Sequence, residues 1–161
     1  MATNTNAHVL AAIVLVLALA ASCATAQNVV ELASGNFTTT VATGTSMVLF
    51  YSPWCPHCKR AAPAYRNFAR KTKALRKDHP GFTIAQINCE ANEETCDTHA
   101  IEGYPTFLIF QEGKALFEYD GETDSDSLTT FVTDAAKKGW KFTPHAAAAP
   151  PDAAAPVHED L

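Results

Sequence analysis

Apolar residues in the middle of the chain form short runs and alternations that predict strands. Residues 46–51 (SMVLFY) and 82–89 (FTIAQINC) are short, largely apolar runs, which are typical of strands buried on both faces. Residues 28–32 (NVVEL) predict a further short strand. Residues 105–119 (PTFLIFQEGKALFEY) alternate on either side of a central EG pair, which predicts an antiparallel hairpin.

Four other segments favour helices. Residues 55–76 are rich in Ala, Lys and Arg with apolar positions near helical spacing, and Pro63 is expected to kink this helix. Residues 34–41 and 90–101 predict two short helices. Residues 124–140 begin with Asp and Ser, which are good N-caps, and end with two lysines and a glycine. The order β-α-β-α-β-α-β-β-α predicts an α/β domain.

The N-terminal segment has the pattern of a secretory signal. Residues 1–26 contain no Asp, Glu, Lys or Arg, and residues 9–21 are an unbroken apolar run. This run is shorter than the roughly 18 apolar residues that a membrane-spanning helix needs. We therefore predict a signal peptide over 1–26, cleaved before Gln27 after an A-x-A site, with no stable membrane insertion of the mature chain. An uncleaved membrane anchor is the alternative.

The C-terminal segment, residues 143–161, consists mostly of Ala and Pro. Such a composition buries too little apolar surface to offset the entropy of ordering the chain, so we predict a disordered tail. The folded domain is then expected over 27–142. The last four residues read HEDL.

Charge argues against nucleic acid as a partner. The formal net charge is −5 at pH 7, and the basic residues are scattered apart from those between Lys71 and Lys77. Nucleic-acid binding requires a basic face, which this pattern does not provide. His79, His99 and His145 have no evident partner and are expected on the surface.

Four cysteines remain once the signal peptide and Cys23 are removed. They are Cys55, Cys58, Cys89 and Cys96. A secreted chain enters an oxidising compartment in which disulfides persist. Four cysteines allow three pairings, and the count alone does not choose among them.

The segment YSPWCPHCKR, residues 51–60, places the first two of these cysteines in a reactive setting. Cys55 falls at the predicted start of a helix, where free N–H groups and the helix dipole favour a thiolate, the form that attacks disulfides. Pro56 suits the first helical turn, and His57 can add a donor or a positive charge beside the same sulfur. Cys58, one turn further, is placed to resolve a mixed disulfide.

A zinc site and a structural staple are weaker alternatives for Cys55 and Cys58. CxxC is half of many zinc sites, but no second CxxC or HxxxH follows, and Cys89 to Cys96 has poor ligand spacing. A bridge across so short a loop removes little entropy from the unfolded chain. We predict no metal.

Three motifs in order resemble those of the thioredoxin fold, and in particular the single domains of protein disulfide isomerases. They are FYSPWCPHCKRAAPAY, GYPTF and EYDGETDSDSL, and the resemblance covers roughly residues 28–138. It implies a thioredoxin fold with a central mixed β-sheet flanked by helices. It also implies a thiol–disulfide oxidoreductase or isomerase that needs no redox cofactor.

The resemblance also implies which residues meet substrate. Tyr104 and Pro105 would form a cis-proline loop beside the sulfurs, and Trp54 and Pro56 would complete a surface for an unfolded client. The spacing of Cys89 and Cys96 before GYPTF resembles that of isomerase domains with a second, structural cysteine pair. Aromatic residues are frequent in cores, so mere packing is the alternative for Trp54 and Tyr104.

Three departures from the family concern proton transfer. The family usually has a buried carboxylate where this chain has Leu49, and a lysine where it has Gln86. The arginine often found after the DG pair is also missing. Losing acid and lysine together leaves no unpaired buried charge.

The Pro-His dipeptide between the cysteines resembles that of the bacterial periplasmic disulfide oxidase, which suggests a strong oxidant.

The expected partners are cysteine-containing unfolded or folding proteins, with glutathione or a thiol oxidase as redox partner. HEDL resembles the retrieval signals of the endoplasmic reticulum, which suggests the lumen of that compartment; secretion is the alternative. A rival function is a non-catalytic, chaperone-like binding module on the same fold. Retention of both Cys55 and Cys58 argues against it.

Overall fold

The computed structural model describes residues 28–142. Within this range the elements follow the predicted order, with one extra helix. The predicted signal peptide, its cleavage before Gln27, the tail and HEDL lie outside the described residues and stay predictions. No helix between residues 28 and 142 has the length and apolar composition needed to cross a membrane.

The centre of the molecule is a five-stranded mixed sheet with the strand order β1-β3-β2-β4-β5. β1, β3 and β2 are parallel, and β4 and β5 are antiparallel to their neighbours. Glu112 and Gly113 join β4 to β5 with φ values of 49° and 81°, as a type I′ hairpin turn requires. The bounds are β1 (Val30–Leu32), β2 (Thr45–Tyr51), β3 (Phe82–Asn88), β4 (Thr106–Gln111) and β5 (Lys114–Glu118).

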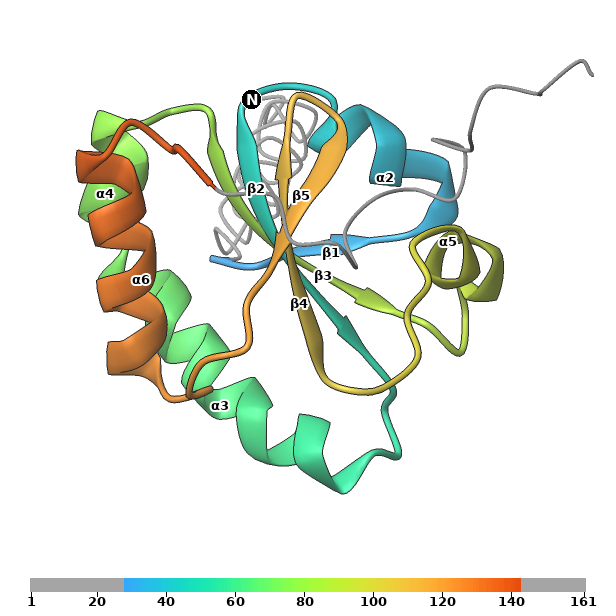
Figure 1. The fold of residues 1–161 in the computed structure, drawn as a ribbon. Helices are drawn as coiled ribbons and strands as arrows, with labels where there is room; N and C mark the ends of the chain where they lie inside the picture. Colours follow the sequence, from blue (N-terminus) through green and yellow to red (C-terminus); the bar gives the residue numbers. More distant parts are fainter. Residues whose placement is uncertain (1–27, 143–161) are drawn as a thin grey trace, which may run out of the picture.

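Helices cover both faces of the sheet (Figure 1). α2 (Ser34–Val41) and α5 (Glu93–Thr98) lie on one face, and α3 (Pro56–Lys71), α4 (Lys73–Asp78) and α6 (Ser125–Lys137) on the other. β2, in the middle, is buried on both faces except at Tyr51, as its apolar run predicts. This is the mixed α/β architecture that the resemblance implies.

The long helix predicted over 55–76 is divided in two. α3 continues through Pro63 and ends at Lys71, and α4 begins after Thr72. The Thr72 side chain is buried, and its hydroxyl donates to the Phe68 carbonyl at 2.9 Å. The backbone leaves the α-helical region at this residue, with φ −86° and ψ 11°, and the helix resumes after it.

The expectation of a surface position for His99 is wrong. This residue follows α5 and is half-buried, and its burial lowers the pKa of the ring. Residues of α2, β2 and β4, which are distant in sequence, meet at this ring, so its burial is not evident from the sequence alone. The ring packs against Phe37, Phe50 and Phe110.

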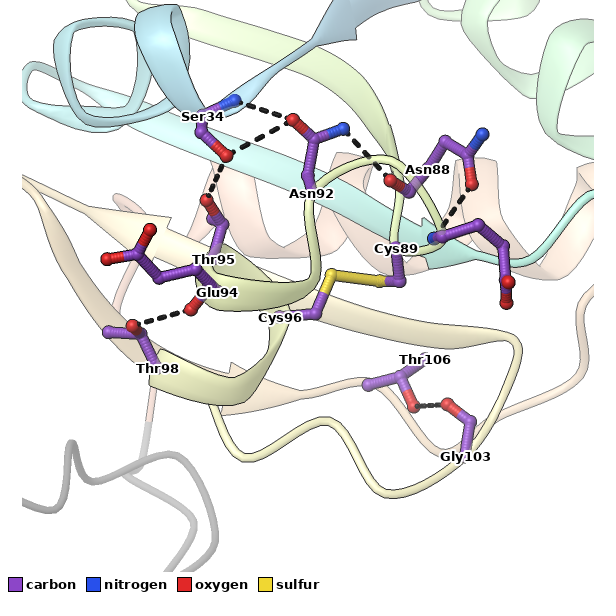
Figure 2. The surroundings of a disulfide bond; sticks show 11 residues. Ser34, Asn88, Cys89, Asn92, Glu94, Thr95, Cys96, Thr98, Gly103 and Thr106 are labelled. Carbon is purple, nitrogen blue, oxygen red and sulfur yellow. Dashed lines mark hydrogen bonds between the residues drawn. A yellow bond between two sulfur atoms is a disulfide. The ribbon is translucent and has the colours of Figure 1, made fainter.

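A disulfide joins Cys89, just after β3, to Cys96 in α5, and both residues are buried (Figure 2). Polar contacts beside it connect α5 to the start of α2. Asn92 Oδ1 accepts from the Ser34 N–H at 2.7 Å, and the Ser34 and Thr95 hydroxyls lie 2.9 Å apart. The bridge and these contacts together hold α5 against the sheet.

Candidate active site

The two remaining cysteines of the described residues, Cys55 and Cys58, are free thiols at the start of α3. Cys55 is the N-cap residue, with extended backbone dihedrals, and Pro56 occupies the first turn. Pro fits there because its missing N–H would have no helical partner. The Cys55 carbonyl accepts the first helical hydrogen bond, from the Lys59 N–H at 3.1 Å. The β2–α3 connection therefore places the Cys55 sulfur at the positive end of a 16-residue helix.

Several donors stabilise the thiolate of Cys55. The backbone N–H of Cys58 contributes most to lowering the pKa of the Cys55 thiol. The Cys58 thiol, the His57 backbone N–H and the charge of Arg60 act in the same direction, while burial opposes them. With 8% of its surface exposed, Cys55 still reaches solvent. A lowered pKa and solvent contact together are what an attacking cysteine needs.

Cys58 has the opposite chemistry. Burial first, and then the hydrogen bond and the charge of Cys55, raise the pKa of the Cys58 thiol to about 11. Only 4% of its surface is exposed. Cys58 is therefore a neutral thiol at neutral pH, and it must lose its proton before it can attack a disulfide.

The ring of His57 does not contact either sulfur through a hydrogen bond described in the structure. Its Nδ1 lies 2.8 Å from Nη2 of Arg60, and arginine can only donate, so this nitrogen accepts. His57 instead acts on Cys55 through its backbone N–H. The cation near Cys55 is Arg60, which the sequence analysis missed. The sequence did offer a signal for Arg60, because it lies about one helical turn after the CxxC segment begins and its charge could therefore face Cys55.

The loop before β4 lies against Cys55. The Tyr104 carbonyl oxygen is 3.6 Å from the Cys55 sulfur, and the Tyr104–Pro105 peptide bond is cis. Both loop residues are half-buried, and Trp54 has 64% of its surface exposed. The structure thus places the Tyr104–Pro105 loop next to the Cys55 sulfur. Trp54 and Pro56 are the direct sequence neighbours of Cys55, and Trp54 is exposed.

The position below Cys58 is apolar, as the sequence indicates. Leu49 on β2 is 2% exposed and pairs in register with Gln86 on β3. Gln86 is in turn opposite Glu31 on β1, and its Nε2 donates to a Glu31 carboxylate oxygen at 2.6 Å. A carboxylate is therefore present in this cross-strand row, at the edge strand, which the sequence analysis did not identify.

Comparisons with known proteins agree with this architecture. The family model described as Thioredoxin matches residues 28–134. The chain is 36% identical over 124 residues to protein disulfide-isomerase A3 of Gallus gallus, covering 76% of this chain and 23% of that protein. It is 34% identical over 128 residues to protein disulfide-isomerase 1 of Dictyostelium discoideum, covering 78% and 34% respectively. The chain thus spans about a quarter to a third of the length of these curated relatives.

Among solved structures, the first thioredoxin domain of mouse protein disulfide-isomerase A4 is similar with a TM-score of 0.61 and 28% identity. The match covers 83% of this chain and 89% of that domain. The J-Trx1 fragment of ERdj5 is similar with a TM-score of 0.61 and 29% identity, covering 68% of this chain and 52% of the fragment. Since the family model spans more than half of the sequence and the sheet has the expected order, the chain belongs to the thioredoxin family, and its relatives there include protein disulfide-isomerases.

Proposed function

We propose that this protein is a thiol–disulfide oxidoreductase that forms or rearranges disulfides in folding secretory proteins. One observation supports this most: two neighbouring thiols have opposite pKa shifts, lowered at Cys55 and raised at Cys58. A solvent-accessible thiolate next to a buried neutral thiol is the arrangement that sequential attack and resolution require. The catalytic roles are therefore Cys55 as nucleophile and Cys58 as resolving cysteine, with His57 supporting the thiolate through its N–H.

The reaction transfers two electrons without a redox cofactor. The Cys55 thiolate attacks a client disulfide, forms a mixed disulfide and releases the client's second sulfur as a thiolate. Cys58 then loses its proton and attacks the Cys55 sulfur, which releases the client as a dithiol and closes the Cys55–Cys58 bond. The reverse sequence oxidises a client dithiol and leaves Cys55 and Cys58 reduced. Glutathione disulfide or a thiol oxidase would then accept two electrons and restore the Cys55–Cys58 bond.

Client binding is proposed at the two edges of the site. The exposed ring of Trp54 offers apolar contact to an unfolded chain, and Pro56 extends this side. Tyr104 and Pro105 form the other side, where the backbone next to the sulfur is available to an extended client segment. The client class is cysteine-containing unfolded or partly folded polypeptide.

The compartment is proposed from the chain ends. A cleaved signal peptide over 1–26 would bring the protein into the secretory pathway, and HEDL resembles a retrieval signal, so the lumen of the endoplasmic reticulum is the proposed site. Secretion is the alternative if HEDL does not act in retrieval. The oxidising lumen also suits a strong oxidant, as the Pro56-His57 pair suggests.

Oxidative refolding tests the proposed activity. A reduced client with several cysteines is refolded in a glutathione buffer, with the wild-type protein or with Cys55→Ser/Cys58→Ser. The wild-type protein should accelerate disulfide formation, whereas the double variant, which keeps Trp54 and the Tyr104 loop, should not. Equal suppression of client aggregation by both proteins, without acceleration by either, would indicate the non-catalytic binding module instead.

A further inference from the structure

The resolving step poses a question about proton transfer. Cys58 is buried and its pKa is raised to about 11, so little thiolate exists at neutral pH. Leu49, which lines the same cavity as Cys58, offers no proton acceptor. Within residues 28–142, no hydrogen bond between Cys58 and a carboxylate is described.

A carboxylate is nevertheless held on the same side of the sheet. Glu31 accepts from the Gln86 side chain at 2.6 Å and from the Tyr51 hydroxyl at 3.1 Å, each through a different carboxylate oxygen. Tyr51 is two residues beyond Leu49 on β2, and so its side chain points to the same face as Leu49. The carboxylate thus lies on β1, two strands away from Leu49, and two hydrogen bonds fix its orientation.

One cavity lies next to the cysteine, and a neighbouring cavity lies against the carboxylate. The space next to Cys58 has a volume of about 230 Å³, enough for several waters at about 30 Å³ each. A second cavity of about 610 Å³ lies against Glu31, and the two share Gln86 and Arg66. The walls of the smaller cavity include Leu49, Tyr51, Ser52, Cys58 and Gln86.

A further observation indicates that the cavity next to Cys58 is polar. The Ser52 hydroxyl lies in its wall, is fully buried and has no hydrogen-bond partner in the described part of the chain. Buried hydroxyls are normally paired, often with an ordered water. Burial first, and then the negative charges of Glu31 and of a Cys58 thiolate, raise the pKa of Tyr51 to about 12. The Tyr51 hydroxyl therefore keeps its proton at neutral pH, and it is electrostatically coupled to both Glu31 and Cys58.

We propose that Glu31 accepts the proton that Cys58 releases during resolution, by way of a cavity water and the Tyr51 hydroxyl. The Cys58 S–H gives its proton to the water, the water gives one to Tyr51, and Tyr51 gives its own to the Glu31 carboxylate. The sulfur electron pair left on Cys58 forms the bond to Cys55, and the client sulfur leaves as a thiolate. In client oxidation the same path returns a proton to Cys58. This inference rests on the proposed oxidoreductase function.

Stopped-flow measurement of the two half-reactions, with a disulfide-containing peptide as client, tests the inference. Glu31→Gln should slow resolution by about tenfold or more, since a positioned base contributes on the order of a hundredfold or more and cavity water replaces part of it. Attack by Cys55 should be unchanged. Tyr51→Phe should also slow resolution alone, whereas Glu31→Asp, which keeps the carboxylate, should recover most of the rate. Glu94→Gln, which removes an equal charge from α5, should change neither step.

A pH profile separates proton transfer from a structural effect. Resolution in Glu31→Gln should rise in proportion to hydroxide across the neutral range, while the wild-type rate should rise less steeply. The inference would be overturned if Glu31→Gln resolved the mixed disulfide at the wild-type rate, or if it slowed attack and resolution equally. Absence of both steps in the wild-type protein would instead refute the proposed function, and the inference with it.

Discussion

Cys55→Ser is expected to abolish disulfide exchange, while Cys58→Ser is expected to accumulate mixed disulfides with clients. A serine hydroxyl cannot replace the thiolate that the α3 N-terminus stabilises at position 55, so the rate should fall by roughly a thousandfold or more. Cys58→Ser retains this nucleophile but lacks the sulfur that closes the Cys55–Cys58 bond. The first half of the reaction should therefore proceed and then stop.

Non-reducing gels of acid-quenched reactions distinguish the two variants. Cys58→Ser should show client-sized additions that disappear with reductant, and Cys55→Ser should show almost none. The double variant Cys55→Ser/Cys58→Ser serves as the control for non-specific association. More trapped client in Cys55→Ser than in Cys58→Ser would reverse the assignment of nucleophile and resolving cysteine.

Cys89→Ala/Cys96→Ala is expected to lower the free energy of unfolding by about 2 to 3 kcal/mol. The bridge closes a short loop, with a sequence separation of seven, and loop-closure entropy gives about 2.5 kcal/mol for such a loop. The two cysteines are 3% and 2% exposed, so the substitutions also remove buried sulfur contacts. The polar contacts of Asn92 with Ser34 remain and should preserve the fold.

Urea unfolding of the variant and of the wild-type protein, with and without reductant, measures this effect. Reductant should lower the stability of the wild-type protein more than that of the variant, because reduction of the Cys55–Cys58 pair affects both proteins and only the wild-type protein also loses the Cys89–Cys96 bridge. The rate of Cys55 attack should be similar in both, because the bridge lies on α5 and the site on α3. Recovery of Cys89 and Cys96 as free thiols after oxidation in air would contradict the structural role.

Much of the fold follows from local patterns that the sequence displays directly. The apolar run of β2 requires burial on both faces, and the EG pair has the conformations of a tight hairpin. Asp124 caps α6 with its side chain accepting from two N–H groups, as its position predicts. The break at Thr72 was not predictable in this way, because the sequence on both sides of it favours helix.

The site was predictable to the extent that it lies in one short segment. Cys55, Pro56 and Cys58 occupy the helix start that the spacing predicts. Glu31 could not be found in this way, since its relation to Cys58 arises from the register of three strands that are distant in sequence. Arg60 was not identified from the sequence as the positive charge near Cys55. The structure shows the His57 ring paired with Arg60 and not with the sulfur.

Redox titration of the Cys55–Cys58 pair tests the central claim most directly. The protein is equilibrated in glutathione buffers of stepped potential, quenched in acid and alkylated, and the two cysteines are counted by mass. We predict one reversible two-electron transition at or above about −180 mV, the value of a typical isomerase, since the stabilised Cys55 thiolate favours the reduced state. A pair that stays reduced throughout, or a bond that resists reduction to below about −300 mV as structural disulfides do, would contradict the account.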